Sequence, residues 1–214
     1  MGGLDSAIAA LKKGEFVILH DGVGRENEAD MVLLGEKITP EAVRKMRKDA
    51  GGLICVSLDS ESAARLHLNF AVDLLAQTKN PLADMGNKKM KYGDMPAFSV
   101  SINHLSTFTG ITDNDRSTTI REFAKLVKGK GGVEEFRANF RAIGHVFLLV
   151  SRGLEKRRGH TELSVELAKR AGVTPVMVLC EMLSDTGNAM TKEEAQEYAR
   201  KNGFVFLEGK ELVK

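Results

Sequence analysis

The stretch that decides the fold is FVILHDGVGRENEADMVLL at residues 16–34, where two short apolar runs flank a polar segment. The apolar runs, at residues 16–19 and 31–34, have the length and composition of buried strands. A short strand-to-strand connection of this kind is not the crossover of a regular βαβ unit. It therefore favours a mixed sheet over an all-parallel one.

The rest of the chain alternates between helix and strand signals, and it has no internal repeat or change in composition that would mark a domain boundary. Thr39 and Thr191 open helices, because each is a preferred capping residue followed by a helix-start pattern. Residues 77–96 have no period and are predicted to be a surface loop, long enough to be a lid or binding loop. Helices are expected at residues 40–50, 59–66, 113–127, 162–171 and after 191, and further strands at 53–58, 97–103, 143–150, 175–183 and 204–207. The pattern predicts one mixed sheet covered by helices, in a single domain over residues 1–214.

Composition excludes several classes of protein. The 31 basic and 29 acidic side chains give a net charge of +2, which is far too balanced for a protein that coats DNA. No apolar run approaches the ~20 residues that cross a bilayer. Cys55 and Cys180 lie inside apolar runs and are expected to be buried free thiols, as in a cytoplasmic protein. We expect neither a nucleic-acid partner nor a membrane.

Three carboxylates, Glu26, Glu28 and Asp30, alternate along the second half of the opening stretch. In an extended chain they would share one face, where they need a cation or basic partners to remain ionised together. Carboxylate oxygens are the ligands that Mg²⁺ prefers. A solvated acidic edge strand, paired with Arg25, is an equally good reading of the spacing alone.

A second cluster, RRGHTE at residues 157–162, directly precedes a predicted helix. Helix N-termini bind phosphate through free amide groups, and arginine adds a bidentate fork. Gly159 would let the backbone approach a ligand, and His160 could bind a metal ion or move a proton. A plain helix cap at Thr161 with solvated arginines is the weaker alternative, because a cap does not need the histidine.

Further candidates are less specific. Glu181 ends an apolar strand, where it could be a general acid or base or simply the partner of an arginine. His145 lies in an apolar run, where a satisfied core histidine is the commoner case. The hydroxyl-rich segment 107–116 precedes a helix, so its side chains either cap that helix or contact phosphate or hydroxyl groups.

Together these segments resemble 3,4-dihydroxy-2-butanone 4-phosphate synthase of riboflavin biosynthesis, in its monofunctional form. The matching stretches are RENEAD (25–30), GGLICVSL (51–58), TFTGITDNDRSTTI (107–120), GHVFLL (144–149), RRGHTE (157–162) and LCEMLSDTGNAM (179–190). They occur in the family's order and span nearly the whole chain.

The resemblance implies a three-layer α/β/α fold of the α+β class with a mixed, twisted sheet, and a homodimer with shared active sites. It implies a lyase that converts ribulose 5-phosphate to 3,4-dihydroxy-2-butanone 4-phosphate and formate, with Mg²⁺ or Mn²⁺ and two divalent ions per site. The matching positions suggest Glu26, Glu28 and His160 as metal ligands and Asp30, His145 and Glu181 as catalytic residues. Substrate contacts are implied for Arg25, Glu26, Asp30, Cys55, Thr112, Arg157, Arg158, Gly159, His160, Thr161 and Glu181.

The sequence departs from the family's pattern at several points. Residues 22–24 replace the usual acidic run before the first motif, and Ala29, Ile143 and Val150 replace a usual Gly, Pro and Arg. Two other functions use similar residues. One is a different metal-dependent sugar-phosphate isomerase or aldolase, which would release no formate. The other is an RNA-binding module with a basic face, which would comprise Lys125, Lys128, Lys130, Arg137 and Arg141.

Overall fold

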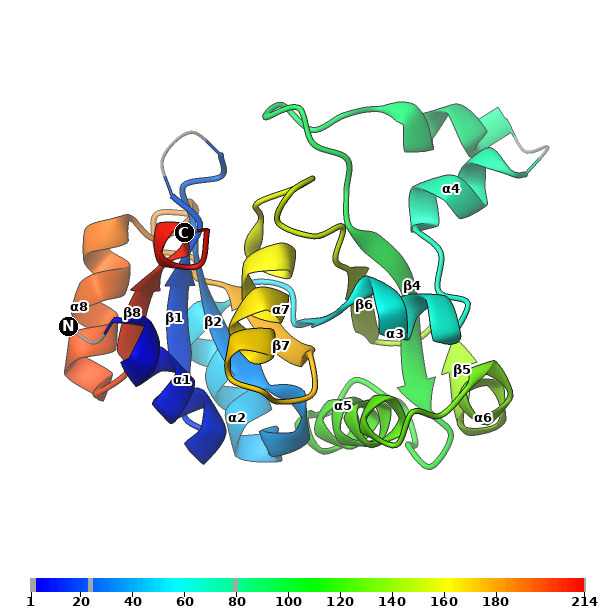
Figure 1. Ribbon diagram of the computed structural model, residues 1–214, viewed down its shortest axis with the longest axis horizontal. Coiled ribbons are helices and arrows are strands. Elements are labelled where there is room, and N and C mark those ends of the chain that lie inside the picture. Colours follow the sequence, from blue (N-terminus) through cyan, green and yellow to red (C-terminus); the bar gives the residue numbers. More distant parts are fainter. Residues whose placement is uncertain (1–2, 23–24, 79–80, 214) are drawn as a thin grey trace.

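The computed structural model (Figure 1) describes residues 3–22, 25–78 and 81–213, and in this part of the chain eight strands form one sheet. Their spatial order is β5-β4-β6-β3-β7-β2-β1-β8. In chain order the strands are β1 (Val17–His20), β2 (Ala29–Leu34), β3 (Cys55–Leu58), β4 (Phe98–His104), β5 (Phe140–Ala142), β6 (Val146–Val150), β7 (Val176–Glu181) and β8 (Val205–Glu208).

The sheet is mixed, as predicted. The polar link after β1 returns the chain as an antiparallel neighbour, β2, and β2 in turn pairs antiparallel with β7. Strand β3 runs antiparallel to β7 and parallel to β6, while β8 runs parallel to β1. Strand β2 therefore lies inside the sheet. The reading of residues 26–30 as a solvated acidic edge strand is wrong.

Helices cover both faces of the sheet. The bounds of the helices are α1 (Leu4–Lys13), α2 (Pro40–Lys45), α3 (Ser60–Arg65), α4 (Ala71–Ala76), α5 (Asp113–Lys128), α6 (Val133–Asn139), α7 (His160–Arg170) and α8 (Lys192–Asn202). Short turns of other helical types cover Gly35–Lys37, Met46–Ala50, Pro81–Asn87 and Gly209–Glu211. No helix in the described residues is long and apolar enough to span a membrane.

Alternation along the strands sends successive side chains into two separate cores. On one face Val17 and Leu19 pack with Leu163 and Leu167 of α7, and α1 joins this core. On the other face Ile18 lies in the core that contains residues of α2, α5 and α8. The α/β/α layering implied by the family resemblance is confirmed.

Several predicted boundaries differ from the structure. Residues 143–145 lie outside β6, so His145 is an exposed residue before the strand and not a buried one within it. Helix α7 begins at His160, two residues earlier than predicted. Along β4 the expected apolar face is mixed, because Phe98 is exposed while Ser99 and Ser101 are buried.

Candidate active site

A cavity of about 250 Å³ lies where the start of β2, the end of β7 and the start of α7 meet. Segment 90–98 forms its remaining wall. Most of the predicted site residues line this cavity, although they come from distant parts of the sequence. The lining residues are Glu26, Glu28, Asp30, Cys55, Met90, Tyr92, Pro96, Ala97, Phe98, Leu149, Arg157, His160, Thr161, Leu179 and Glu181.

Two carboxylates of the cavity belong to neighbouring strands. Asp30 pairs with Glu181 in the register of β2 and β7. Asp30 is 1% exposed, and its Oδ1 has no hydrogen-bond partner among the described residues. Burial, opposed by His160 but reinforced by the carboxylates of Glu181 and Glu26, raises the pKa of Asp30 to about 7. Asp30 is thus a carboxyl group that can exchange a proton near neutral pH.

Glu181 is held by the backbone of the segment before β3. Its Oε2 accepts a hydrogen bond of 2.8 Å from the amide of Leu53. The neighbouring Gly52 has no room for a side chain, since a Cβ there would lie 2.5 Å from the same oxygen. Among the described residues Glu181 makes no ion pair, so its reading as the partner of an arginine is wrong.

His160 is the first residue of α7 and is buried beside the carboxylates. Its Nε2 lies 3.2 Å from the carbonyl oxygen of Glu28, so this nitrogen carries a hydrogen that it donates. Its Nδ1 lies 3.4 Å from Oε2 of Glu26. Burial lowers the pKa of His160, but the nearby carboxylates, Asp30 first, outweigh it and raise the pKa to about 9.

Glu26 and Glu28 reach the cavity from a turn and not from an extended strand, because β2 begins only at Ala29 and Asn27 has a φ of 58°. Hydrogen bonds to the carboxylate of Asp21 stabilise this turn. Its Oδ2 accepts from the amide of Glu26 at 3.2 Å and from Nη1 of Arg25 at 2.9 Å, and its Oδ1 accepts from the amide of Glu28 at 3.1 Å.

The donor set fits a divalent cation. Asp21, Glu26 and His160 each offer one ligand atom, and these atoms lie within 4.8 Å of one another. Because Nε2 of His160 donates to a carbonyl, Nδ1 is the nitrogen left to bind a metal ion, and it faces Glu26. Burial disfavours ionised Glu26, but hydrogen bonds from His160, Tyr92 and Arg25 hold its pKa well below the ordinary value. Sequence reasoning put Glu28 in this set; the structure groups Asp21 with the other two instead.

The start of α7 holds a buried arginine. Nη1 of Arg157 donates to Oε2 of Glu162 at 2.6 Å, and the amide of Gly159 donates to the same oxygen at 3.3 Å. Gly159 has no room for a Cβ, which would collide with the guanidinium groups of Arg157 and Arg25. Gly159 is the residue that caps the helix. Thr161 is the second residue of α7, so its reading as a plain helix cap is wrong.

Segment 90–96, here named the lid segment, supplies residues that sequence reasoning missed. Tyr92 hydrogen-bonds to Glu26 and lies under Arg25, whose Cζ is 4.9 Å from the ring centroid. Oδ2 of Asp94 lies 3.2 Å from Nε of Arg25 and 3.6 Å from Nε of Arg157. The only sequence signal was the aperiodic composition of residues 77–96, which predicted a lid or binding loop without naming its contacts.

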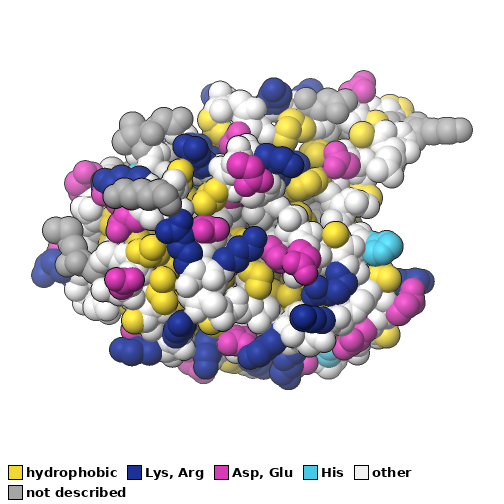
Figure 2. Space-filling model, viewed as in Figure 1, with side chains coloured by type: hydrophobic (Ala, Val, Ile, Leu, Met, Phe, Trp, Pro, Cys, Tyr) yellow, Lys and Arg dark blue, Asp and Glu magenta, His cyan; other side chains and the backbone are white. Residues whose placement is uncertain are grey.

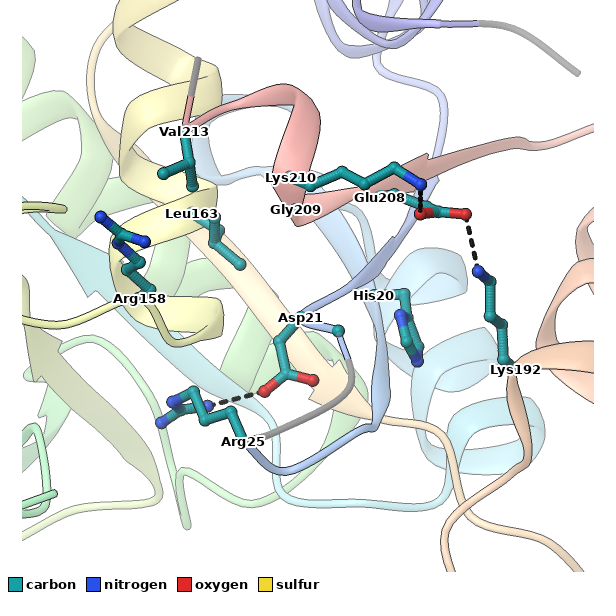
Figure 3. Close-up of a pocket in the computed structure, with 11 residues that line it drawn as sticks. His20, Asp21, Arg25, Arg158, Leu163, Lys192, Glu208, Gly209, Lys210 and Val213 are labelled. Carbon is teal, nitrogen blue, oxygen red and sulfur yellow. Dashed lines mark hydrogen bonds and ion pairs between the residues drawn. The ribbon is translucent and has the colours of Figure 1, made fainter. Parts of the chain in front are cut away.

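Arg158 points away from this cavity. It lines a separate, larger hollow of about 830 Å³ at the ends of β1 and β8, together with Leu163 and Lys192 (Figure 3). Arg25 and Asp21 border this second hollow. The structure therefore separates the two neighbouring arginines, and it brings only Arg157 to the wall of the carboxylate cavity.

Thr112 and His145 do not line the cavity of their own chain. Oγ1 of Thr112 accepts from the amide of Asp115 at 3.1 Å, which makes Thr112 the cap of α5. His145 is exposed, and its Nδ1 lies 3.2 Å from Nδ2 of Asn103. Near them in the sequence, Phe108 is 94% and Ile143 is 81% exposed.

The surface gives no support to an RNA-binding face. Figure 2 shows basic and acidic side chains interspersed, with no large area of one sign on the side in view. Lys125 pairs with Glu122, Lys128 with Glu36, and Arg137 with Glu134. Both cysteines are free and buried, as predicted.

Comparison with known proteins identifies the family. The family model of 3,4-dihydroxy-2-butanone 4-phosphate synthase matches residues 5–214. The 3,4-dihydroxy-2-butanone 4-phosphate synthase of Methanothermobacter thermautotrophicus is 41% identical over 98% of this chain and 94% of its own length. That of Archaeoglobus fulgidus is 39% identical over 98% of this chain and 92% of its own length.

Solved structures give the same result. A 3,4-dihydroxy-2-butanone 4-phosphate synthase in complex with two magnesium ions superposes with a TM-score of 0.80 and 30% identity, covering 99% of this chain and 95% of that one. The two-domain synthase RibBX of A. baumannii has a TM-score of 0.82 and 26% identity, covering 99% of this chain and 57% of that one. By its sequence and its fold, the chain belongs to the 3,4-dihydroxy-2-butanone 4-phosphate synthase family of enzymes.

Proposed function

We propose that this chain converts ribulose 5-phosphate to 3,4-dihydroxy-2-butanone 4-phosphate and formate, as a step of riboflavin biosynthesis. The observation that carries the proposal is one small cavity that combines three features. It holds a buried carboxyl group with a raised pKa, an oxygen-rich donor set with one imidazole nitrogen, and a buried arginine at a helix start. A sugar phosphate that must lose protons needs all three.

Glu26 and His160 are the residues we assign to a Mg²⁺ or Mn²⁺ ion, with Asp21 and Glu28 beside them. A divalent ion would stabilise negative charge that develops on neighbouring oxygens of the sugar. Two ions per site are supported by the structural relative that is described with two magnesium ions. The carboxylate of Asp21 already accepts three hydrogen bonds, which makes it a weaker metal ligand than Glu26 and His160.

Proton movement is assigned to Asp30 and Glu181. The reaction requires abstraction of a proton at C3, loss of the C1 hydroxyl, a shift of the carbon skeleton and expulsion of C4. Asp30 is suited to the first step, because a base whose pKa is near the working pH is the most effective. Glu181 lines the same cavity from the neighbouring strand. There it can donate protons to later intermediates or accept protons from them.

The phosphate is assigned to the start of α7. Arg157 supplies a charged fork whose orientation is fixed by Glu162. The hydroxyl of Thr161 and the backbone near Gly159 lie at the positive end of the helix dipole. Cys55 lines the cavity on the side of the sugar, and the guanidinium group of Arg25 lies beside Gly159 at the start of α7.

We infer that the working form is a homodimer whose partner completes the site. Support comes from Thr112 and His145, which the family resemblance marks as site residues although neither lines the cavity of its own chain. The exposed Phe108 and Ile143 flank these two positions in the sequence. Exposed apolar side chains at these positions suit an isologous contact, which would carry Thr112 and His145 of one subunit toward the cavity of the other.

The deciding experiment is incubation of the protein with ribulose 5-phosphate and Mg²⁺, followed by assays for formate and the four-carbon phosphate. Equal amounts of both products are expected. An isomerase would convert the substrate to another pentose phosphate without formate, and an aldolase would release an aldehyde fragment instead. Either of these results would overturn the proposed function.

A further inference from the structure

The lid segment carries one anion that the proposed mechanism does not use. Asp94 places Oδ2 3.2 Å from Nε of Arg25 and 3.6 Å from Nε of Arg157. The two guanidinium groups are largely buried, with side chains 13% and 9% exposed, whereas that of Asp94 is 31% exposed. A partly exposed carboxylate on a long loop thus bridges two largely buried arginines.

The two arginines have unused hydrogen-bonding capacity. Nη2 of Arg25 and Nε of Arg157 are buried and have no hydrogen-bond partner within the described residues. The guanidinium groups of Arg25 and Arg157 both lie beside Gly159 at the start of α7, so the two arginines are close to each other there. Buried donors without an acceptor destabilise a protein, and the carboxylate of Asp94 leaves both of these nitrogens without a hydrogen bond. A phosphate monoester, with three oxygens and up to two charges, satisfies this arrangement better.

We propose that Asp94 is an internal competitor of the substrate's phosphate for Arg25 and Arg157, so that arrival of the phosphate releases the lid segment from them. The inference rests on the proposed function only in assigning a phosphate to Arg157. Under this proposal Asp94 makes the site selective for anionic ligands, because a ligand that lacks a strongly charged anionic group cannot displace the carboxylate. A neutral or weakly charged sugar would meet a lid that stays attached to both arginines.

Competition has a measurable consequence. The apparent dissociation constant of a ligand equals its intrinsic constant divided by the fraction of molecules whose site is free to bind it. Asp94→Asn removes the competing charge at nearly constant shape, so that fraction rises. We expect the Kd for inorganic phosphate and for ribulose 5-phosphate to fall roughly three- to tenfold. The alternative role, in which Asp94 orients the arginines while phosphate is bound, predicts weaker binding.

Asp84→Asn is the matched control. Asp84 lies in Pro81–Asn87 of the same loop, is exposed and makes no ion pair among the described residues, so its substitution removes the same charge from the same region. A general electrostatic effect would tighten phosphate binding equally in both variants. The proposal requires the gain in Asp94→Asn to exceed that in Asp84→Asn clearly. It also requires the gain to disappear in the double variant with Arg157→Lys.

The experiment is isothermal titration of inorganic phosphate, and separately of ribulose 5-phosphate, into the wild type and these variants. Hydrogen exchange of the lid-segment amides supplies a second readout in the unaltered protein, where added phosphate should speed exchange. Unchanged or weaker phosphate binding by Asp94→Asn, or slower lid exchange with phosphate, overturns the proposal. Neither measurement needs turnover. If formate is not released while these results hold, the proposed function fails and the competition stands.

Discussion

Asp30 and Glu181 occupy paired positions of two hydrogen-bonded strands, so the sheet itself sets the spacing of the two acidic groups. Neither depends on the lid segment or on the turn around Asn27 for its position. Strand β2 is flanked by β1 and β7, which makes this part of the site the most rigid. The two groups proposed to transfer protons thus lie on the sheet, whereas the groups proposed to bind the cation and the phosphate lie in loops and at the start of α7.

The first prediction concerns Glu181→Gln. Glutamine can keep the hydrogen bond from the amide of Leu53, because its carbonyl oxygen can replace Oε2. It cannot accept or release a proton at neutral pH. We expect kcat to fall by about 10² to 10⁴-fold with little change in KM or in the midpoint of thermal unfolding. Near-normal formate release by a folded variant would assign Glu181 to structure and leave Asp30 and His145 as proton carriers.

The second prediction concerns the cation. Treatment with EDTA should abolish formate release, and Mg²⁺ or Mn²⁺ should restore it. Glu26→Gln should raise the Mg²⁺ concentration for half-maximal activity at least about tenfold, because Glu26 lies against Nδ1 of His160. Glu28→Gln is the comparison, and its smaller effect would agree with the grouping of Asp21 with Glu26 and His160. Full turnover after thorough removal of metal would contradict the assignment.

The third prediction compares two neighbouring arginines. Arg157→Lys keeps the charge but loses the fork that Glu162 orients, so KM for ribulose 5-phosphate should rise roughly tenfold or more. Arg158→Ala removes a whole side chain from the separate hollow of Figure 3, and KM should change less than about twofold. Steady-state kinetics of the two purified variants provide the test. An effect of Arg158→Ala as large as that of Arg157→Lys would place the phosphate between the two cavities.

The fourth prediction tests the shared site by complementation. His145→Ala and Glu181→Gln should each be inactive as purified proteins. If each site takes His145 from one subunit and Glu181 from the other, mixed dimers contain one intact site and one doubly altered site. Unfolding and refolding an equal mixture should then restore roughly a quarter of the wild-type activity. No recovery, with mixed dimers confirmed by mass spectrometry, would place both residues in the same subunit's site.

The fifth prediction follows from the raised pKa of Asp30. Between its ordinary value of 3.8 and its folded value of about 7, the folded protein binds a proton that the unfolded chain has released. The free energy of unfolding therefore falls as pH rises through this window. An asparagine side chain cannot titrate in this range, so the Asp30→Asn variant should lose this contribution to the decline.

The measurement is urea unfolding in EDTA at about pH 4.5 and about pH 6.5. The free energy of unfolding of Asp30→Asn minus that of the wild type should rise by on the order of 2 kcal/mol from the lower to the higher pH. This follows because one pKa unit corresponds to about 1.4 kcal/mol. The window lies below the range in which His160, whose pKa is raised to about 9, loses its proton. A pH-independent difference would mean that Asp30 is ionised in the folded protein throughout.

Much of the fold could be predicted from local patterns. The apolar runs of β1, β2, β3 and β7 are short and continuous because both faces of these strands are covered, and that signal is strong in the sequence. The caps at Thr39, Thr112 and Thr191 are local hydrogen bonds and follow from residue type. Which strands pair is a long-range property, and local patterns carry only the preference for a mixed sheet.

The site was predictable where chemistry-bearing residues cluster in motifs, as at 25–30 and 157–162. Asp21, Tyr92 and Asp94 were missed because each acts on residues that are distant in sequence or joined to it by an irregular turn. Arg158 lines a different hollow from Arg157, which adjacency in the sequence could not show. Glu28 lines the cavity as expected, but spacing alone could not show that Asp21 groups with Glu26 and His160.

The two free thiols are both buried but lie on opposite faces of the sheet, which makes them reporters of two different motions. Cys55 is at the wall of the cavity on β3, whereas Cys180 on β7 belongs to the core on the opposite face. Burial raises the pKa of both thiols, that of Cys180 to about 12, so neither is a ready nucleophile at neutral pH. An alkylating reagent reaches Cys55 once the lid segment moves, but it reaches Cys180 only when the sheet separates from its helices. The ratio of the two labelling rates therefore separates opening of the active site from unfolding of the protein.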